Sequence, residues 1–315
     1  MPSLNMPVQR LKVAILPLDL PCSGPVTHSG EILTTGKSHR KKPDRFSLNE
    51  DMAMKKVSRF KYATWNIRGL GGKEEELDKI LNENNILISV ITESKKKLKG
   101  TKDTEHYTVI YSGVDRYTRG QSGVMIWIHK SMSKKIDHYK FWNDRIIETR
   151  LKTQRGHLTI IGVYAPTEGK DEANEEFYET LQKVLDKVNK NDYIMLIGDM
   201  NARVGNNRVA NIVGTNGETT LNNNGKKLID FCTFNNLKVM NTFFKHKEIH
   251  KFTWEARGQK SIIDYFITNM KTSRIIQDIR VYRSIEIDSD HYLLCAKVNF
   301  PPRWLNRINK KAPLK

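Results

Sequence analysis

The chain has 315 residues, of which 38% are hydrophobic, with a formal net charge of +18 and three scattered cysteines. This length suits one large domain with tails, and the charge favours a polyanionic partner, nucleic acid ahead of a membrane surface. The sequence contains no apolar run near the roughly 20 residues of a membrane span, no Cys-x-x-Cys pair and no P-loop. We therefore expect an intracellular protein with no membrane anchor, no zinc site and no nucleotide cofactor.

The composition and the apolar pattern of the sequence change near residue 60. Most of the prolines precede that point, and residues 1–59 show no clear period, so we predict a disordered basic tail there. We place a single domain at 60–299 and a basic tail at 300–315. The cluster His39-Arg40-Lys41-Lys42-Pro43 is a candidate for nuclear import, with a solvated run as the alternative. The nucleus is therefore the compartment we expect.

Apolar runs of strand length follow one another from Phe60, with a few helical periods between them. We predict strands at 60–65, 86–91, 107–111, 124–128, 146–151 and 158–164, and a helix at 74–85. Further on, we predict helices at 177–188 and 226–234, and strands ending at 198 and at 237–240, 262–267, 279–282 and 292–298. Strands dominate and many connections resemble hairpins. This pattern predicts an α/β (α+β) fold, a two-sheet sandwich with outer helices, rather than an all-parallel doubly wound sheet.

Polar residues at the ends of these strands are the candidates for chemistry. The central motif, Gly198-Asp199-Met200-Asn201, closes a buried-type strand, and Asp264 interrupts the apolar run 261–266. The other candidates are Asn66, Glu93, Tyr164, Asp290 and His291. Each one alone is explained about as well by a turn, a cap or a core residue. Their recurrence at strand ends favours a common site at one edge of the sheets.

The residue types suit metal-assisted hydrolysis of a phosphodiester. Mg²⁺ prefers carboxylate and amide oxygens, which Glu93, Asp290 and Asn66 offer. A bound metal stabilises charge on the phosphate oxygens and on the leaving oxygen. Asp199 is placed to orient a water molecule and to accept its proton.

The remaining candidates fit contacts to phosphate. Asn201 and Tyr164 can donate hydrogen bonds to phosphate oxygens. His291 can bind phosphate or transfer a proton, and Asp264 can fix its tautomer, because a carboxylate within an apolar run needs a partner.

Basic loops accompany these strand ends. Lys95 follows Glu93 closely, and Arg116 and Arg119 share the segment 115–120. Such loops can follow a phosphate backbone, with a plain solvated surface as the alternative. We interpret Trp142 and Trp254 as core residues in preference to base-stacking ones.

Six ordered motifs carry a family resemblance. They are Trp65-Asn66, Thr92-Glu93-Ser94-Lys95, Val163-Tyr164-Ala165-Pro166, Gly198-Asp199-Met200-Asn201, Ser261-Ile262-Ile263-Asp264-Tyr265 and Ser289-Asp290-His291. In this order they resemble the endonuclease/exonuclease/phosphatase superfamily over residues 60 to 299. The resemblance implies a DNase I-like fold, a four-layered α/β sandwich with two mixed sheets packed face to face. It also implies a metal site at Asn66, Glu93 and Asp290, and a His291–Asp264 pair.

Within that superfamily the chain resembles the endonuclease domains of RTE-type non-LTR retrotransposons and the related craniofacial development protein 2-like host proteins. The resemblance places Ser261 near the DNA backbone. No Tyr/Phe-x-Asp-Asp motif of a reverse transcriptase is present. We therefore expect the endonuclease of a retrotransposon without its reverse transcriptase.

The function that we predict is a Mg²⁺-dependent DNA endonuclease, with Mn²⁺ as an alternative ion, which nicks DNA to leave a 3′ hydroxyl. We expect it to act as a monomer. Two alternatives stay open at this point. One is a phosphatase of inositol phosphates or lipids in the same superfamily, and the other is a catalytically silent nucleic-acid-binding protein.

Overall fold

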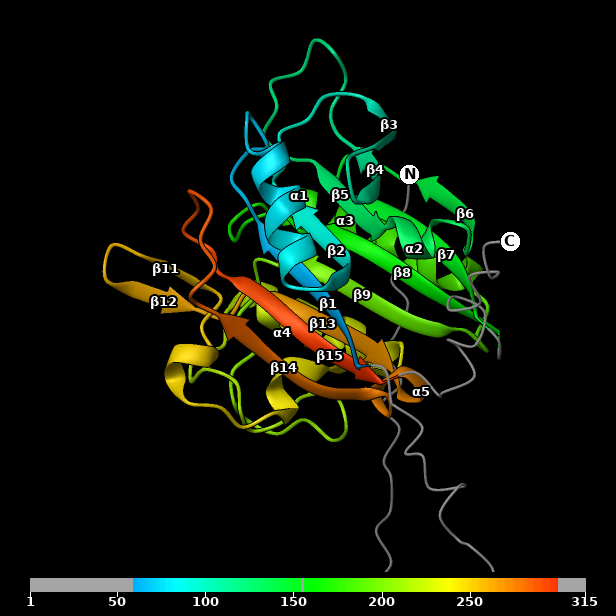
Figure 1. Ribbon diagram of the computed structural model, residues 1–315. Helices are drawn as coiled ribbons and strands as arrows, with labels where there is room; N and C mark the ends of the chain where they lie inside the picture. Colours follow the sequence, from blue (N-terminus) through cyan, green and yellow to red (C-terminus); the bar gives the residue numbers. More distant parts are fainter. Residues whose placement is uncertain (1–58, 154–155, 300–315) are drawn as a thin grey trace, which may run out of the picture. The chain divides into compact units, whose positions relative to one another are not determined.

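A computed structural model of the chain describes residues 59–153 and 156–299, and within them seven strands form the first sheet. Their order across the sheet is β14-β15-β1-β2-β5-β4-β3 (Figure 1). The strands are β1 (Arg59–Asn66), β2 (Ile86–Thr92), β3 (Lys99–Asp103), β4 (Tyr107–Ser112), β5 (Val124–His129), β14 (Ile276–Tyr282) and β15 (Leu293–Asn299).

A second sheet of six strands has the order β10-β13-β9-β8-β7-β6 among the described residues. Its strands are β6 (Ile136–Phe141), β7 (Ile146–Thr153), β8 (Gly156–Tyr164), β9 (Tyr193–Asp199), β10 (Leu237–Val239) and β13 (Asp264–Asn269). A separate hairpin consists of β11 (Trp254–Ala256) and β12 (Gln259–Ser261), and it projects beside the sheets in Figure 1.

Three longer helices accompany the sheets. They are α1 (Glu74–Glu83), α3 (Asp171–Lys187) and α4 (Asn223–Phe234); the short α2 (Lys130–Ser133), α5 (Met270–Ser273), η1 (Met240–Phe243) and η2 (Glu248–His250) follow strands or line loops. Helix α1 connects the parallel pair β1–β2, and α3 connects the parallel pair β8–β9. The other strand pairs within the two sheets are antiparallel, so both sheets are mixed as predicted.

The period-two alternation of the strands produces the layers. In β9, Met195 and Ile197 face a core shared by the two sheets, whereas Ile194 and Leu196 face the core beneath α3 and α4. In β1, Trp65 faces a third core under α1. The order of layers is therefore α1, first sheet, second sheet, then α3 and α4. This confirms the predicted four-layered α/β sandwich.

The predicted elements recur with shifted boundaries. Helix α3 begins at Asp171, six residues before the apolar period, because its first turns are acidic and largely exposed. The edge strands β3 and β6 and the hairpin β11–β12 were not predicted, since each lacks an apolar alternation of useful length. The sequence suggested that Asp264 interrupts an apolar strand, but Asp264 is instead the first residue of β13.

No helix within residues 59–153 and 156–299 is long and apolar enough to cross a membrane. The two predicted tails, 1–59 and 300–315, lie outside the described residues, apart from Arg59 at the start of β1. The predicted domain limits therefore stay a prediction.

Candidate active site

The candidate residues come together because the strands that carry them end at the same edge. Asn66 ends β1, Tyr164 ends β8 and Asp199 ends β9, while Glu93 directly follows β2. Asp264 begins β13, which runs antiparallel to β9 and pairs Asp264 with Asp199. Asp290 and His291 precede β15, which runs antiparallel to β1. One edge of the sandwich therefore collects polar side chains from distant parts of the chain.

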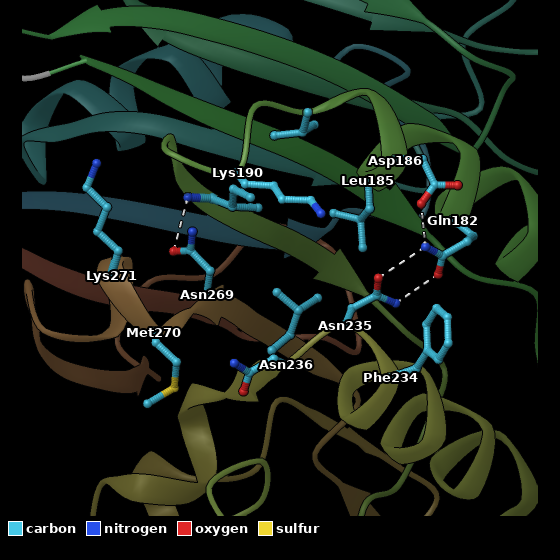
Figure 2. Close-up of a pocket in the computed structure, with 13 residues that line it drawn as sticks. Gln182, Leu185, Asp186, Lys190, Phe234, Asn235, Asn236, Asn269, Met270 and Lys271 are labelled. Atoms are coloured by element: carbon cyan, nitrogen blue, oxygen red, sulfur yellow. Dashed lines mark hydrogen bonds between the residues drawn. The ribbon is translucent and has the colours of Figure 1, made fainter.

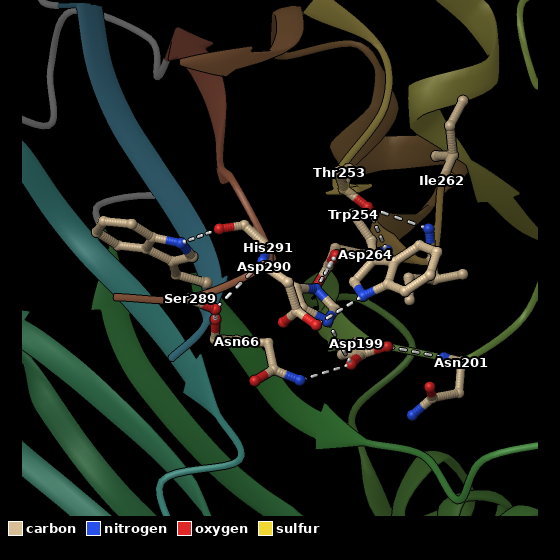
Figure 3. A network of polar contacts seen from close by, with 12 residues as sticks. Asn66, Asp199, Asn201, Thr253, Trp254, Ile262, Asp264, Ser289, Asp290 and His291 are labelled. Carbon is tan, nitrogen blue, oxygen red and sulfur yellow. Dashed lines mark hydrogen bonds and ion pairs between the residues drawn. The ribbon is translucent and has the colours of Figure 1, made fainter. Parts of the chain in front are cut away.

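An open pocket of about 340 Å³ lies at this edge. Most of the predicted site residues line it, namely Asn66, Glu93, Tyr164, Asp199, Asn201, Ser261, Asp290 and His291. Asp264 lies behind His291 and does not line the pocket. Figure 3 shows the Asn66 and His291 side chains directed toward Asp199, with Asp264 hydrogen-bonded to His291.

Asp264, His291 and Asp199 form a buried row. His291 Nδ1 lies 2.9 Å from Asp264 Oδ2, and His291 Nε2 lies 4.0 Å from Asp199 Oδ2. The three residues are at most 7% exposed. Two carboxylates face each other across the β9–β13 ladder, an arrangement that like charges make unfavourable unless a cation lies between them. The imidazole of His291 occupies that place.

Burial and neighbouring charges shift the pKa values of Asp199 and His291. Burial, and then the neighbouring Asp264 carboxylate, raise the pKa of Asp199 to about 7. Burial by itself lowers the pKa of His291, but the charge and the hydrogen bond of Asp264, with the charge of Asp199, bring that pKa to about 9. Near neutral pH the row therefore holds an imidazolium beside a carboxyl group that is close to its titration point.

Asn66 connects the two sheets at the pocket. Its Nδ2 donates to Asp199 Oδ2 at 2.9 Å and to Glu93 Oε2 at 3.2 Å, and its Oδ1 accepts from the backbone N of Arg68 at 3.0 Å. The Tyr164 hydroxyl donates to the same Glu93 oxygen at 3.2 Å. Burial, with the charges of Asp199 and Glu93, raises the pKa of Tyr164 well above its usual value, so the phenol stays a donor.

Asp290 has one oxygen held and one oxygen without a hydrogen bond. Trp254 Nε1 donates to Asp290 Oδ2 at 3.1 Å. Oδ1 is buried and has no hydrogen-bond partner among the described residues; the Arg68 Nε atom lies 3.6 Å away. A buried carboxylate oxygen in this state needs a cation or a donor. The donor set of Asp290 and Glu93 therefore fits a hard divalent cation at this side of the pocket.

A second donor set lies beside the first. One ligand atom each from Asp199, Asp264 and His291 lies within 4.8 Å of the others, so this buried row could also hold a metal ion. It includes an imidazole, which suits transition metals better than Mg²⁺. The carboxylates of Glu93 and Asp290 offer only oxygen.

The backbone is strained where it carries the site. Glu93 and Asn201 adopt left-handed conformations, with φ of 49° and 44°. Such conformations cost energy in non-glycine residues and tend to occur at functional positions. Gly198 has a φ of 149°, and a Cβ there would lie 1.9 Å from the Val163 carbonyl oxygen, so only glycine lets β8 and β9 approach this closely. The left-handed conformation of Asn201 bends the chain around the Asp199 carboxylate. The backbone N of Asn201 donates to Asp199 Oδ1 at 2.8 Å.

The predicted basic residues lie outside the pocket. Lys95 Nζ is 3.0 Å from Glu93 Oε1 and also donates to the Arg68 carbonyl oxygen at 2.9 Å, so it borders the site. Arg116 and Arg119 are exposed on the loop between β4 and β5 and do not line the pocket. Their role in binding DNA stays a prediction.

Several residues at the site were not predicted. The interpretation of Trp254 as a core residue was wrong, since it is partly exposed, lines the pocket and binds Asp290. Arg68 also lines the pocket, and Ser289 Oγ donates to the Asn66 carbonyl oxygen at 2.7 Å. Ser289 belongs to the motif Ser289-Asp290-His291, and Arg68 lies two residues after Trp65-Asn66, which was the available signal. For Trp254 the sequence offered a choice between a core and a base-stacking role, but its contact with Asp290 depends on the hairpin β11–β12.

A larger pocket, of about 640 Å³, lies between the C-terminal ends of α3 and α4 and helix α5 (Figure 2). Gln182 and Asn235 hydrogen-bond to each other across it, at 2.8 and 3.1 Å. None of the predicted site residues lines this pocket. The predicted residues Glu93, Asp199, Asp290 and His291 line the smaller one.

Known proteins share this architecture. A family model described as "Endonuclease-reverse transcriptase" matches residues 158–295. Craniofacial development protein 2 of Tragulus javanicus is 32% identical over 238 residues, which cover 74% of this chain and 41% of that protein. The chain thus spans about two fifths of the length of this curated relative.

Two solved structures extend the comparison of folds. The catalytic domain of Xenopus laevis APE2 superimposes with a TM-score of 0.60 at 17% identity, covering 76% of this chain and 91% of that one. The endonuclease domain of TRAS1, a telomere-specific non-LTR retrotransposon, gives 0.56 at 16% identity, covering 77% and 99%. These two structures show that the fold is shared, and the sequence matches identify the chain as a member of the endonuclease/exonuclease/phosphatase superfamily.

Proposed function

We propose that this protein is a divalent-metal-dependent endonuclease that hydrolyses DNA phosphodiesters and leaves a 3′ hydroxyl. One observation carries the proposal: the buried Asp264–His291–Asp199 row faces the carboxylates of Glu93 and Asp290 in a single open pocket. A proton acceptor, a cationic phosphate ligand and an oxygen-rich metal site are thereby combined within reach of one phosphate group.

Glu93 and Asp290 would hold Mg²⁺, or Mn²⁺ in its place. Asp290 Oδ1 is the buried oxygen without a hydrogen bond, and Glu93 is the carboxylate on which Asn66 and Tyr164 converge. When bound, the metal supplies positive charge to the phosphate and leaving-group oxygens. Asn66 directs its Nδ2 toward the carboxylates, so it orients Glu93 and Asp199; its predicted role as a metal ligand would need its Oδ1.

The remaining residues act on the water and on the phosphate. Asp199, with a pKa near 7, would orient the attacking water and accept its proton. His291 would donate from Nε2 to a phosphate oxygen, since Asp264 holds its Nδ1. Asn201 would donate to phosphate oxygens, as would Ser261, which is nearly buried at the pocket wall. Tyr164 would do so by turning its single hydroxyl proton from Glu93 to the phosphate.

The experiment that tests the proposal is nicking of supercoiled plasmid by the full chain with Mg²⁺, with Mn²⁺ and with EDTA. We expect nicks with either metal, none with EDTA, and product ends that a polymerase extends. Glu93→Gln and His291→Ala should each abolish nicking. Unchanged nicking in both variants would refute the mechanism.

Two other results would redirect the proposal. Tight DNA binding without nicking under any metal would indicate a catalytically silent binding protein. Release of phosphate from inositol phosphates, with DNA left intact, would indicate a phosphatase. An origin from a non-LTR retrotransposon, a nuclear location and a monomeric state are part of the same proposal. The last two are tested by localising the tagged chain and by light scattering.

A further inference from the structure

The loop that connects β4 to β5 presents an aromatic side chain to solvent. Tyr117 is 94% exposed, although it is a large and partly apolar residue. Single exposed aromatics occur on many surfaces and need no explanation by themselves. The surroundings of Tyr117 make this one different in three respects: the order of its loop, the position of the loop and the charge around it.

The loop is held in shape by its own hydrogen bonds. Asp115 Oδ1 accepts from the backbone N of Tyr117 at 2.7 Å and from that of Thr118 at 2.9 Å, and the Thr118 hydroxyl donates to Asp115 Oδ2. Lys97 Nζ donates to the Arg116 carbonyl oxygen at 2.7 Å. Tyr117 is thus presented on an ordered turn, and a contact made by it would cost little additional ordering.

The base of the loop packs on the segment that carries the site. A Cβ at Gly120 would lie 2.6 Å from the Lys95 carbonyl oxygen, so the two backbones are in close contact there. The backbone N of Lys95 donates to the Ser122 carbonyl oxygen at 2.8 Å, and Lys95 Nζ pairs with Glu93. The base of the loop therefore contacts Lys95, which lies two positions after the proposed metal ligand Glu93. In Figure 1 the β4–β5 connection extends beyond the end of the sheet.

The charge around Tyr117 is positive. Arg116 and Arg119 are exposed on either side of it in sequence, and Lys97 lies beneath Arg116. The nearby acid, Asp115, uses both carboxylate oxygens within the loop. An exposed ring between exposed guanidinium groups matches the chemistry of a base flanked by its phosphates.

We propose that Tyr117 stacks on a DNA base beside the scissile phosphate, while Arg116 and Arg119 contact the flanking phosphates. The inference rests on the proposed function, and it adds a specificity determinant to it. A stacked tyrosine requires a base step that opens, so nicking should favour steps that unstack readily, such as TA and CA/TG. The preference would arise from deformation of the DNA and not from a base-specific hydrogen bond.

The first test measures affinity for a duplex that spans a mapped nick position. The full chain with Asp199→Asn serves as the uncut binder, to which Tyr117→Ala, Tyr117→Phe or Arg116→Gln is added. We expect Tyr117→Ala to weaken binding about fivefold or more, and Tyr117→Phe to bind normally. Tyr117→Ala should leave the salt dependence of binding unchanged, whereas Arg116→Gln should reduce its slope by about one.

The matched control is Tyr139→Ala, which removes another exposed tyrosine, on the edge strand β6 of the other sheet. We expect normal binding from it. Tyr117 is almost fully exposed, so thermal unfolding of Tyr117→Ala should match that of the parent chain.

The second test locates the contact directly. Duplexes that carry 5-iodouracil at successive positions around the nick are irradiated in complex with the Asp199→Asn chain, and mass spectrometry identifies the linked residue. We expect a crosslink to Tyr117 at one or two positions, lost in Tyr117→Ala. Normal affinity of Tyr117→Ala, or crosslinks only elsewhere, would overturn the inference while nicking by the wild type upholds the endonuclease. A wild type that neither binds nor nicks DNA would overturn both.

Discussion

Strand β9 has a buried aspartate at each end, and the two differ in their partners. Asp192, just before the strand, accepts from Arg150 Nε at 2.8 Å, from Arg150 Nη2 at 3.1 Å and from the Thr159 hydroxyl at 2.9 Å. Asp199, at the other end, accepts from Asn66 and from a backbone N, and the nearest cationic group is His291 at 4.0 Å. Both residues are at most 2% exposed.

The two ends therefore titrate in opposite directions. Burial raises the pKa of Asp192, but its hydrogen bonds from Arg150 and Thr159 outweigh burial and leave that pKa below its usual value. At Asp199 burial dominates, the Asp264 charge adds to it, and the pKa rises to about 7. A permanent guanidinium makes one carboxylate structural. No guanidinium accompanies Asp199 among the described residues, so its ionised form is unfavourable in this buried place and the carboxylate is available to bind a proton.

The largest expected effect is on activity, from Asp199→Asn. The amide keeps the shape of the side chain but cannot accept a proton from water, so nicking should fall by about 10²- to 10⁴-fold. Single-turnover nicking measures this. The free energy of unfolding at pH 8 should change little, because the variant removes a buried charge opposite Asp264 but turns an NH2 group toward one of the two donors, Asn66 Nδ2 or the backbone N of Asn201. Asp230→Asn, on the exposed face of α4, is the control and should nick normally.

The converse expectation applies to Asp192→Asn. It leaves the Arg150 guanidinium facing a neutral amide in a mostly buried place, with Asp137 at 3.7 Å as its other acidic neighbour, which should lower the free energy of unfolding by about 2 kcal/mol. Urea denaturation measures this loss. Asp103→Asn, at the exposed end of β3, should change stability little. A strong loss of stability in Asp199→Asn together with none in Asp192→Asn would contradict the comparison.

A smaller effect is expected from Trp254→Phe. The variant keeps an aromatic ring but removes the Nε1 donor to Asp290 Oδ2, so this carboxylate is no longer oriented. Loss of such a partner should raise the Mg²⁺ concentration for half-maximal nicking about tenfold. Calorimetric titration of the DNA-free protein with Mn²⁺ should show the same shift. Trp142→Phe removes an indole donor to Glu148 outside the pocket and is the matched control, with unchanged metal dependence.

The smallest expected effect is the pH dependence of the free energy of unfolding, measured in EDTA. Asp199 has a raised folded pKa, so its contribution to stability is present below its unfolded pKa of about 4 and is lost as pH rises through about 7. Asp192 has a lowered folded pKa, so its contribution is present above about pH 4 and is lost as pH falls further. The free energy of unfolding, measured by denaturation from pH 5 to 8, should decline in the wild type, by at most about 1.4 kcal/mol per pH unit for this group, and decline less in Asp199→Asn. Equal slopes would refute the assigned shift.

Much of the fold followed from local pattern. The buried strands β2, β5, β8 and β9 were predictable because a buried strand requires a run of apolar residues. The edge strands β3 and β6 were not, because one or both of their faces meet solvent and their residues carry no such constraint. Hydrogen bonds to a neighbouring strand define them, and those are tertiary contacts.

The site shows the same division. The sequence by itself determined which carboxylates, amides and histidine stand at strand ends, since strand and turn patterns are local. The tertiary structure alone decided that Asn66 reaches Asp199 from the other sheet and that Trp254 holds Asp290. It also decided that Asp192, just before β9, has a guanidinium beside it, whereas Asp199, at the end of β9, has the imidazole of His291. The physical reason is that burial and charge pairing, which set a carboxyl group's pKa, depend on neighbours distant in the chain.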